Sequence, residues 1–333
     1  MLYAGPTGKC HHDMYAIHIE ADHSLHWAEM PTPVPAPGEV LIEIAACGVN
    51  RADLAQRAGH YPPPPGASPI LGMECAGQIV GLGEGVTQWH PGDKVCALLA
   101  GGGYAEYVAV DARHCLPVPA GLSMTEAACL PEVFTTAYLN LYLEAGLQAG
   151  ERVLLVAGAS GVGTAAIQLC CLSGNPCLVS VGSAVKLERC MALGATDGIV
   201  RGEGELTNLL GGGFDVILDP VGGPALADTL NLLRPGGRLV LIAFMGGREA
   251  QLDLGRVLVK RLRLIGSTLR SRSADEKALL LAQLQEKVWP AFADGRVKPV
   301  LDRVFPMAEV GAAHAHMAAN LNVGKLVLEI PAS

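Results

Sequence analysis

The pattern of apolar and polar positions changes near residue 130. Before that point, short apolar runs such as EVLIEIAACGV and DKVCALL alternate with segments rich in Pro and Gly, and helical patterns are few. Short strands between turn residues are typical of a small antiparallel β-barrel. After that point, apolar strands alternate with helical stretches, as in βαβ units on a parallel sheet.

The second pattern predicts six strands and a doubly wound parallel sheet. The expected strands are Val153–Ala157, Leu178–Gly182, Gly198–Val200, Val216–Asp219, Arg238–Phe244 and Leu262–Gly266. A long amphipathic helix is then expected over Ala274–Ala293, followed by KPVLDRVFP, a further helix and the strand KLVLEIP. We therefore expect an α/β protein with a β-rich domain over 1–130, a nucleotide-binding domain over 131–266, and a return to the first domain over 267–333.

Composition narrows the class of protein. A length of 333 residues suggests two domains, and 50% hydrophobic with 17% charged residues indicates a large buried core. A net charge of −8 argues against partners such as nucleic acid or an anionic membrane. No signal-peptide pattern or uninterrupted membrane span is found, and ten scattered cysteines without a CxxC pair indicate a reduced, cytoplasmic protein.

The first 13 residues are unusual. MYAIHIE, from Met14, has the pattern of a natural start, so Met1–Asp13 is either a flexible extension or a start-site artefact. Cys10, His11, His12 and Asp13 have metal-ligating side chains, but a mobile tail is the favoured interpretation.

The stretch VLLVAGASGVGTAAIQL carries the clearest chemical signal. Its glycines follow the spacing Gly158-x-x-Gly161-x-Gly163, between an apolar strand and a helical pattern. Such a cluster serves either a tight turn alone or a pyrophosphate at the N-terminus of the helix. The surrounding βαβ units favour the second reading, with a cofactor held by Gly158, Ser160, Gly161, Val162 and Gly163.

The end of the second expected strand indicates which nucleotide binds. NAD sites usually carry Asp or Glu there, whereas this chain has Gly182 and Ser183, with Lys186 one turn later and Arg201 past the third strand. Cations and a hydroxyl suit a 2′-phosphate, which a carboxylate would repel. NADPH is therefore favoured, and the alternative is that Lys186 is merely a solvated helix residue.

Several longer motifs resemble a known family. The segment NRADLAQRAGHYPPPPGASPILGMECAG, the stretch GASGVGTAAIQL and the motif LRSR resemble the zinc-independent quinone oxidoreductases of the medium-chain dehydrogenase/reductase superfamily. The resemblance implies a GroES-like catalytic domain, formed by both chain ends, around a Rossmann domain. It also implies NADPH between the two domains and a homodimer joined along the edges of the Rossmann sheets.

The resemblance also bears on metal. Zinc-dependent relatives hold catalytic zinc with a Cys and a His, and the matching positions here are Asn50 and Met73. Neither replaces a thiolate or an imidazole as a zinc ligand, so no metal is expected. Without a Lewis acid, the expected substrates are already electrophilic: quinones or α,β-unsaturated carbonyls.

Matching positions imply roles for further residues. Asn50 and Tyr61 would lie near the nicotinamide and the substrate, and Ser160 would lie in the floor of the cleft as a contact rather than a nucleophile. Tyr61 either donates a hydrogen bond to a developing oxyanion or only shapes the pocket. Arg201 stands where relatives often carry Tyr. Other implied cofactor contacts are Thr136, Val221, Gly222, Phe244, Met245, Leu269, Ser271 and Lys325.

The sequence thus predicts a cytoplasmic, homodimeric NADPH-dependent quinone oxidoreductase that transfers hydride without a metal. One alternative is an alkenal or enone reductase on the same scaffold. An alternative of another class is an NADPH-binding redox sensor, structural protein or RNA-binding protein with little catalysis, although the acidic balance weighs against RNA.

Overall fold

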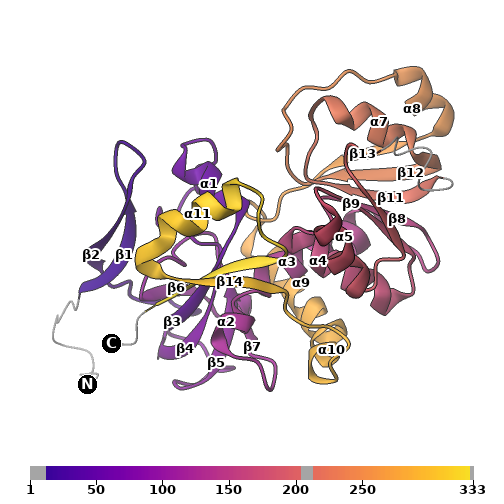
Figure 1. Ribbon diagram of the computed structural model, residues 1–333. Coiled ribbons are helices and arrows are strands. Elements are labelled where there is room, and N and C mark those ends of the chain that lie inside the picture. Colours follow the sequence, from indigo (N-terminus) through magenta and orange to yellow (C-terminus); the bar gives the residue numbers. More distant parts are fainter. Residues whose placement is uncertain (1–12, 204–212, 331–333) are drawn as a thin grey trace.

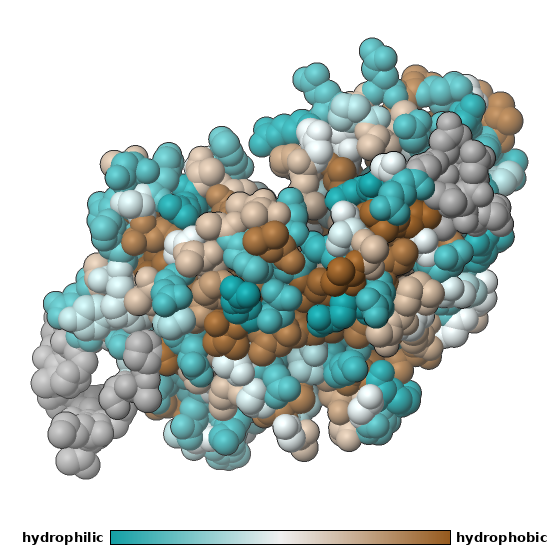
Figure 2. Space-filling model, in the orientation of Figure 1, coloured by the Kyte–Doolittle hydropathy of each residue, from teal (hydrophilic) through white to brown (hydrophobic). Residues whose placement is uncertain are grey.

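The computed structural model describes residues 13–203 and 213–330. The expectations for the N-terminal extension, including Cys10, His11 and His12, lie outside the described residues, apart from Asp13 at the start of β1. The chain forms two lobes (Figure 1), one built from both ends of the described chain and the other from its middle. Figure 2 shows the surface hollowed between them.

The middle of the chain forms a six-stranded parallel sheet. Its strands are β8 (Val153–Val156), β9 (Cys177–Val181), β10 (Asp197–Val200), β11 (Phe214–Asp219), β12 (Leu233–Leu241) and β13 (Arg263–Gly266). They lie in the order β10-β9-β8-β11-β12-β13. The chain moves outward from β8 in one direction and then restarts at β11, so the sheet has a switch point between these two strands, where doubly wound folds bind ligands. The predicted α/β fold is confirmed.

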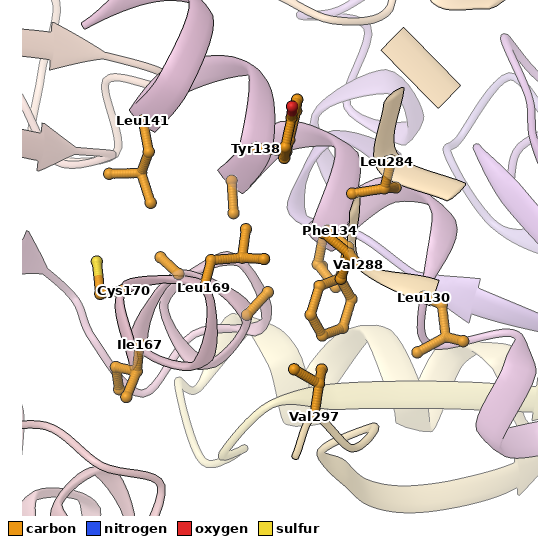
Figure 3. Close-up of a cluster of buried hydrophobic side chains, with 14 of the residues drawn as sticks. Leu130, Phe134, Tyr138, Leu141, Ile167, Leu169, Cys170, Leu284, Val288 and Val297 are labelled. Atoms are coloured by element: carbon orange, nitrogen blue, oxygen red, sulfur yellow. The ribbon is translucent and has the colours of Figure 1, made fainter. Parts of the chain in front are cut away.

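Helices cover the sheet and connect the two lobes. The helices of this part are α3 (Pro131–Tyr138), the π-helical η2 (Leu139–Glu144), α4 (Gly161–Ser173), α5 (Ala184–Ala192), η3 (Gly223–Ala225), α7 (Leu226–Asn231) and α8 (Leu254–Lys260). Figure 3 shows Phe134 of α3, Leu169 of α4 and Leu284 of α9 (Ala274–Lys287) in one buried cluster. Because α3 and α9 enter this cluster together with α4, burial of apolar surface ties the two lobes to each other.

The other lobe contains a seven-stranded sheet. Its strands are β3 (Glu39–Val49), β4 (Glu74–Leu82), β5 (Lys94–Leu98), β6 (Tyr107–Asp111), β7 (Cys115–Pro117), β14 (Leu301–Pro306) and β15 (Lys325–Glu329). The order is β14-β15-β3-β4-β5-β7, and β6 pairs with β3. Strand β15 pairs antiparallel with β3 but parallel with β14, so the sheet is mixed rather than wholly antiparallel as predicted.

Smaller elements complete this lobe. They are the hairpin of β1 (Asp13–Ile19) and β2 (Leu25–Pro31), the helices α1 (Arg51–Arg57), α2 (Met124–Ala127) and α11 (Val310–Ala318), and the short turns η1 (Ala112–His114) and η4 (Met307–Glu309). Helix α1 begins directly after β3. Strand β15 pairs with β3 in the sheet, and this pairing brings the first and last parts of the chain together.

Two predicted elements differ from the structure. The helix expected over Ala274–Ala293 is two helices, α9 (Ala274–Lys287) and α10 (Trp289–Ala293), because Pro290 has no N–H to continue the ladder. The fifth strand ends at Leu241 rather than at Phe244. Phe244 and Met245 therefore lie in the following loop, where their side chains are 50% and 46% exposed.

Candidate functional site

The glycine-rich turn joins β8 to α4. Ala157 has a φ of 57°, and Ser160 caps the helix with its Oγ, which accepts from the N–H of Gly163 at 3.1 Å. The first N–H groups of α4 have no partner within the helix, as is usual in the first turn, and the turn also bridges to Gly324. These donors and the positive end of the helix dipole suit a phosphate.

The glycines of this turn also meet a requirement of the protein itself. A Cβ at Gly163 would lie 2.4 Å from the carbonyl oxygen of Gly158, and one at Gly158 would lie 2.6 Å from Val179. A Cβ at Gly161 would lie 2.8 Å from the Cδ of Lys325. The cluster was predicted to serve a pyrophosphate, and its spacing equally serves close packing of α4, β9 and the segment that enters β15.

Three cations gather beyond the end of β9. The Nη2 of Arg201 lies 3.4 Å from where a Cβ of Gly182 would stand. Lys186 donates from Nζ to the carbonyl oxygen of Asn320 at 2.5 Å, and Arg51 donates from Nη2 to the Oδ1 of the same residue at 2.7 Å. Burial, and then the charge of Arg201, hold the pKa of Lys186 below its usual range.

This group of cations, Arg51, Lys186 and Arg201, has no ion-paired carboxylate in the described part of the chain. Ser183 caps α5 through a bond from the N–H of Lys186 at 3.4 Å, which holds that side chain near the end of β9. Sequence reasoning identified the residues of β9 and α5 but missed Arg51, which reaches the group from the other lobe. Unpaired cations from three elements suit an anionic ligand.

A second polar group lies buried beneath the turn. Lys325 donates from Nζ to the Oε1 of Glu74 at 2.6 Å, to the carbonyl oxygen of Val49 at 2.8 Å and to the Oδ1 of Asn50 at 2.7 Å. Its three N–H bonds are therefore all engaged within the protein, and the cofactor contact expected of Lys325 stays a prediction. Only its aliphatic stem reaches the glycine turn, at Gly161.

The Asn50 side chain is fixed at both ends. Its Oδ1 accepts from Lys325 and its Nδ2 donates to the Oε1 of Glu74 at 2.9 Å. Met73, at the other position matched to a zinc ligand, is buried. Among the residues that the structure describes, no group of three His, Cys, Asp or Glu side chains has the arrangement of a metal site.

A third group surrounds Tyr61, whose ring is half-buried. The guanidinium of Arg270 lies over this ring, 5.3 Å from its centroid. Burial raises the pKa of the Tyr61 hydroxyl, and the nearby charge of Glu132 adds to the effect. Lys277 donates from Nζ to the carbonyl oxygen of Arg270 at 2.7 Å. Neither Arg270 nor Lys277 was identified from the sequence, because both lie far along the chain from Tyr61.

Two carboxyl groups near these clusters have unusual acidity. Burial raises the pKa of Glu132 to about 8, and the neighbouring Glu74 contributes further. Burial also raises the pKa of Asp53 to about 6, despite hydrogen bonds from the N–H groups of Asn50 and Gly72. Glu132 lies in the first turn of α3, and its own N–H donates to the Oε2 of Glu74 at 2.9 Å, so the lobes share a network of buried polar groups.

The remaining expected cofactor contacts divide into exposed and buried residues. Val221 and Gly222 form a turn whose two N–H groups donate to the Oδ1 of Asp219, at 2.6 and 3.1 Å. Thr136 and Leu269 are buried, whereas Ser271 is exposed and hydrogen-bonded to Thr268 at 2.8 Å. The roles predicted for all of these residues stay predictions.

A nicotinamide dinucleotide fits the donors that are present. The helix N-terminus at Gly161 offers N–H groups to a pyrophosphate, and the cations near Gly182 offer charge to the adenosine end. A carboxylate that would accept from a ribose is absent from the described residues at the end of β9, where Gly182 and Ser183 stand.

Comparisons with known families agree with this arrangement. A model of the alcohol dehydrogenase GroES-like domain matches residues 36–120, and a zinc-binding dehydrogenase model matches residues 193–328. The human synaptic vesicle membrane protein VAT-1 homolog is 31% identical over 314 residues, covering 89% of this chain and 80% of its own. The bovine quinone oxidoreductase-like protein 2 is 29% identical, covering 91% of this chain and 88% of its own.

Solved structures agree with the sequence relatives. The CurK enoyl reductase has a TM-score of 0.83 at 30% identity, covering 96% of this chain and 99% of its own. A human VAT-1 homolog-like protein has a TM-score of 0.82 at 26% identity, covering 96% of this chain and 99% of its own. The chain is therefore an oxidoreductase of the medium-chain dehydrogenase/reductase superfamily, whose members bind a nicotinamide cofactor.

Proposed function

We propose that the protein reduces quinones with NADPH and without a metal ion. The observation that carries this proposal is the Asn50 amide, held between Lys325 and Glu74 at the position where zinc-dependent relatives place a thiolate. An amide engaged at both ends supplies no ligand field for zinc, and the thioether of Met73 does not replace an imidazole. Acceptors that are electrophilic without a Lewis acid, such as quinones, suit this site.

The choice of NADPH over NADH rests on the group formed by Arg51, Lys186 and Arg201. A 2′-phosphate brings about two negative charges to a place where the described residues offer cations and no paired carboxylate. The ribose hydroxyl of NADH offers these cations no formal charge. The Ser183 position, which carries no acid, supports the same preference.

The bound cofactor supplies a hydride, and the protein supplies position and charge. The first turn of α4 and the turn at Val221 and Gly222 would hold the cofactor across the switch point of the sheet. Tyr61 remains protonated at neutral pH because burial raises its pKa further, so its hydroxyl can donate a hydrogen bond to a carbonyl oxygen. The apolar cluster around Phe134 packs the two lobes against each other, and this packing keeps these groups in place.

A second candidate is the reduction of an activated C=C bond. It is supported by two solved enoyl reductases, CurK at 30% identity and JamJ at 26% identity, with TM-scores of 0.83 for both. Both reactions place a hydride on an electrophilic carbon conjugated to a carbonyl. They differ in the shape of the acceptor that packs against Tyr61.

NADPH oxidation by the purified protein tests the proposal against a panel of ortho-quinones, para-quinones and alkenals, with NADH as the control. Preferential turnover of quinones with NADPH, unchanged by a chelator, is the expected result. Turnover of alkenals alone would favour the second candidate. Tight NADPH binding without turnover of any acceptor would favour a redox sensor or binding protein, and zinc at one ion per chain would overturn the assignment of Asn50.

We further propose a homodimer joined along β13, an edge strand of the six-stranded sheet. Leu264 of this strand is 46% exposed, and Leu258 and Val259 of the neighbouring α8 are 77% and 76% exposed. An exposed edge with apolar neighbours is usually covered by another chain. Sedimentation equilibrium should give a mass of twice that of one chain. The substitution Leu258→Arg should lower this mass toward that of a single chain.

A cytoplasmic location also remains a proposal. Across the described ranges, no helix combines the length and apolar character needed to span a bilayer. Relatives named as vesicle membrane proteins make fractionation of cells the direct measurement.

A further inference from the structure

Arg270 lies in a connecting segment, but several contacts fix its side chain. The residue is 5% exposed, and it lies between β13 and α9. Its Nε donates to the carbonyl oxygen of Ala100 at 2.8 Å, and its Nη2 donates to the Oε1 of Gln56 at 2.7 Å. These two bonds and the stacking on Tyr61 fix the plane of the guanidinium.

One nitrogen of this guanidinium has no partner. The Nη1 atom is buried and makes no hydrogen bond, and within residues 13–203 and 213–330 no carboxylate lies close enough to Arg270 for an ion pair, although the charges of Asp53 and Glu132 act on it. A buried N–H without an acceptor costs about 1–3 kcal/mol, and more when the group is charged. The fold thus fixes the orientation of the Arg270 guanidinium but leaves its Nη1 donor without an acceptor.

Other arginines of the chain show that such a vacancy is not general. Arg272, only two residues later, is paired with both Glu144 and Glu276. Arg238, which is also buried, pairs with Glu151 at 2.7 Å and donates to the carbonyl oxygen of Ala145 at 2.8 Å. Arg272 and Arg238 each make a direct ion pair with a carboxylate, whereas in the described part of the chain Arg270 makes none, and Asp53 and Glu132 act on it only at longer range.

We propose that the Arg270 guanidinium binds the carbonyl oxygen of the acceptor and holds the negative charge that forms there. This inference rests on the proposed reductase function and names the residue that recognises its substrate class, a carbonyl-conjugated acceptor. Tyr61 is half-buried and its ring stacks on the guanidinium, so the proposal places the acceptor at the edge of this ring, on the side of Nη1. Lys277 acts as a positioning residue, because its Nζ holds the Arg270 carbonyl oxygen.

The proposed step conserves electrons and protons. The acceptor takes a hydride from the dihydronicotinamide of NADPH, and a C–H bond forms at a carbon conjugated to the carbonyl. The electron pair displaced from the π-bond moves to the carbonyl oxygen, which becomes an oxyanion beside Arg270. NADPH becomes NADP⁺, and the oxyanion later takes one proton from solvent or from a protein acid. A fixed cation aimed at this oxygen stabilises the charged state most, which is the requirement for faster chemistry.

A nitrophenol tests this site without turnover. Its phenolate resembles the expected oxyanion, and its ionisation is followed by absorbance in the NADP⁺-loaded protein. We expect the wild-type protein to lower the pKa of the bound phenol by about 1 unit or more, as an opposite charge at close range does. Arg270→Gln should abolish this shift, and Arg270→Lys should retain part of it because charge remains but the fork is lost.

Arg272→Gln is the matched control, because it removes the same charge two residues away from a group that is already paired. It should keep the wild-type shift of the phenol pKa. Thermal unfolding and NADPH affinity of each variant report whether it is folded, and the Arg270→Lys protein keeps the test informative if Arg270→Gln does not fold. With an active acceptor, Arg270→Gln should lower kcat/KM about 100-fold and leave the affinity for NADPH unchanged.

The outcomes separate this inference from the proposed function. A phenol that does not bind the wild-type protein, or whose pKa is the same in wild type and in folded Arg270→Lys and Arg270→Gln, would overturn the oxyanion site. A shift that depends on Arg270 in a protein that reduces no quinone would leave the site standing and remove the quinone as its substrate.

Discussion

The two ends of the candidate site are built in different ways. The phosphate end is made mostly of backbone, in the turn from Gly158 to Gly163, and its residues lie close together in the sequence. The acceptor end is made of side chains from distant segments: Gln56 and Arg270 are 214 positions apart, and Asn50 and Lys325 are 275 apart. A backbone site tolerates few changes of shape, whereas a side-chain site depends on buried charge and its compensation.

The largest effect is expected at the buried ion pair. Lys325→Met should lower the free energy of unfolding by about 3–5 kcal/mol, because it leaves the Glu74 carboxylate, whose side chain is 0% exposed, without its cation. Urea unfolding measures the loss. Arg234→Met breaks an exposed pair with Asp215 and should cost about 1 kcal/mol or less.

Adding Glu74→Gln to Lys325→Met should recover much of the loss, since the double variant buries no unpaired charge. Equal losses in Lys325→Met and Arg234→Met would show that the acceptor end does not depend on this compensation.

Close packing should make the glycine turn the next most sensitive place. Gly163→Ala places a Cβ against the Gly158 carbonyl, a backbone atom that cannot rotate away, so we expect a loss of roughly 2–3 kcal/mol and weaker binding of NADPH. Gly311→Ala is the control, because Gly311 lies in a helix with open space around it and should gain about 0.4–1 kcal/mol. Thermal unfolding of both variants compares them directly, and similar changes in both would remove packing as the reason for Gly163.

The difference between the two ends also explains what the sequence could reveal. Strand–turn–helix spacing is local, so the six strands, the glycine turn and the small residues Gly182 and Ser183 could be predicted from runs of neighbouring residues. Such patterns specify that a helix begins near Gly161. They do not specify what packs against it.

The contacts that sequence reasoning missed depend on long-range pairing. Lys325 was expected as a cofactor contact, and the pairing of β15 with β3, which the sequence did not predict, brings its Nζ to Val49 and Asn50. Arg51 and Arg270 become site residues only when α1 and the segment after β13 meet the rest of the site, and no periodicity records that meeting. A charged residue whose partner is not yet known gives no sequence signal of its own.

Reversing one charge should separate the two nicotinamide cofactors. Lys186→Glu places a carboxylate beside Arg201 and Asn320, where it would repel a 2′-phosphate, so the Kd for NADPH should rise about 10- to 100-fold while that for NADH changes little. Arg189→Glu makes the same change on an exposed turn of α5 and should alter neither constant by much. Fluorescence titration measures both affinities, and equal losses for the two cofactors would mean that another group holds the 2′-phosphate.

The smallest expected effect concerns the acidity of Glu132. Its pKa is about 8 in the folded chain, against an ordinary value of 4.5, so the folded protein binds a proton that the unfolded chain releases as the pH rises. Stability should therefore fall between about pH 5 and pH 8, by roughly 1–3 kcal/mol for a partly exposed carboxyl, and then level off. Asp53, with a pKa of about 6, adds a slope of the same sign only at the acid end of this range.

The variant Glu132→Gln stays neutral and should flatten the dependence of stability on pH between pH 6 and 8, as measured by urea unfolding. Glu188→Gln, on the exposed face of α5, should keep the wild-type slope. An unchanged slope in Glu132→Gln would show that this carboxyl is solvated, and that the acceptor end buries fewer charges than the contacts among Glu74, Lys325 and Asn50 imply.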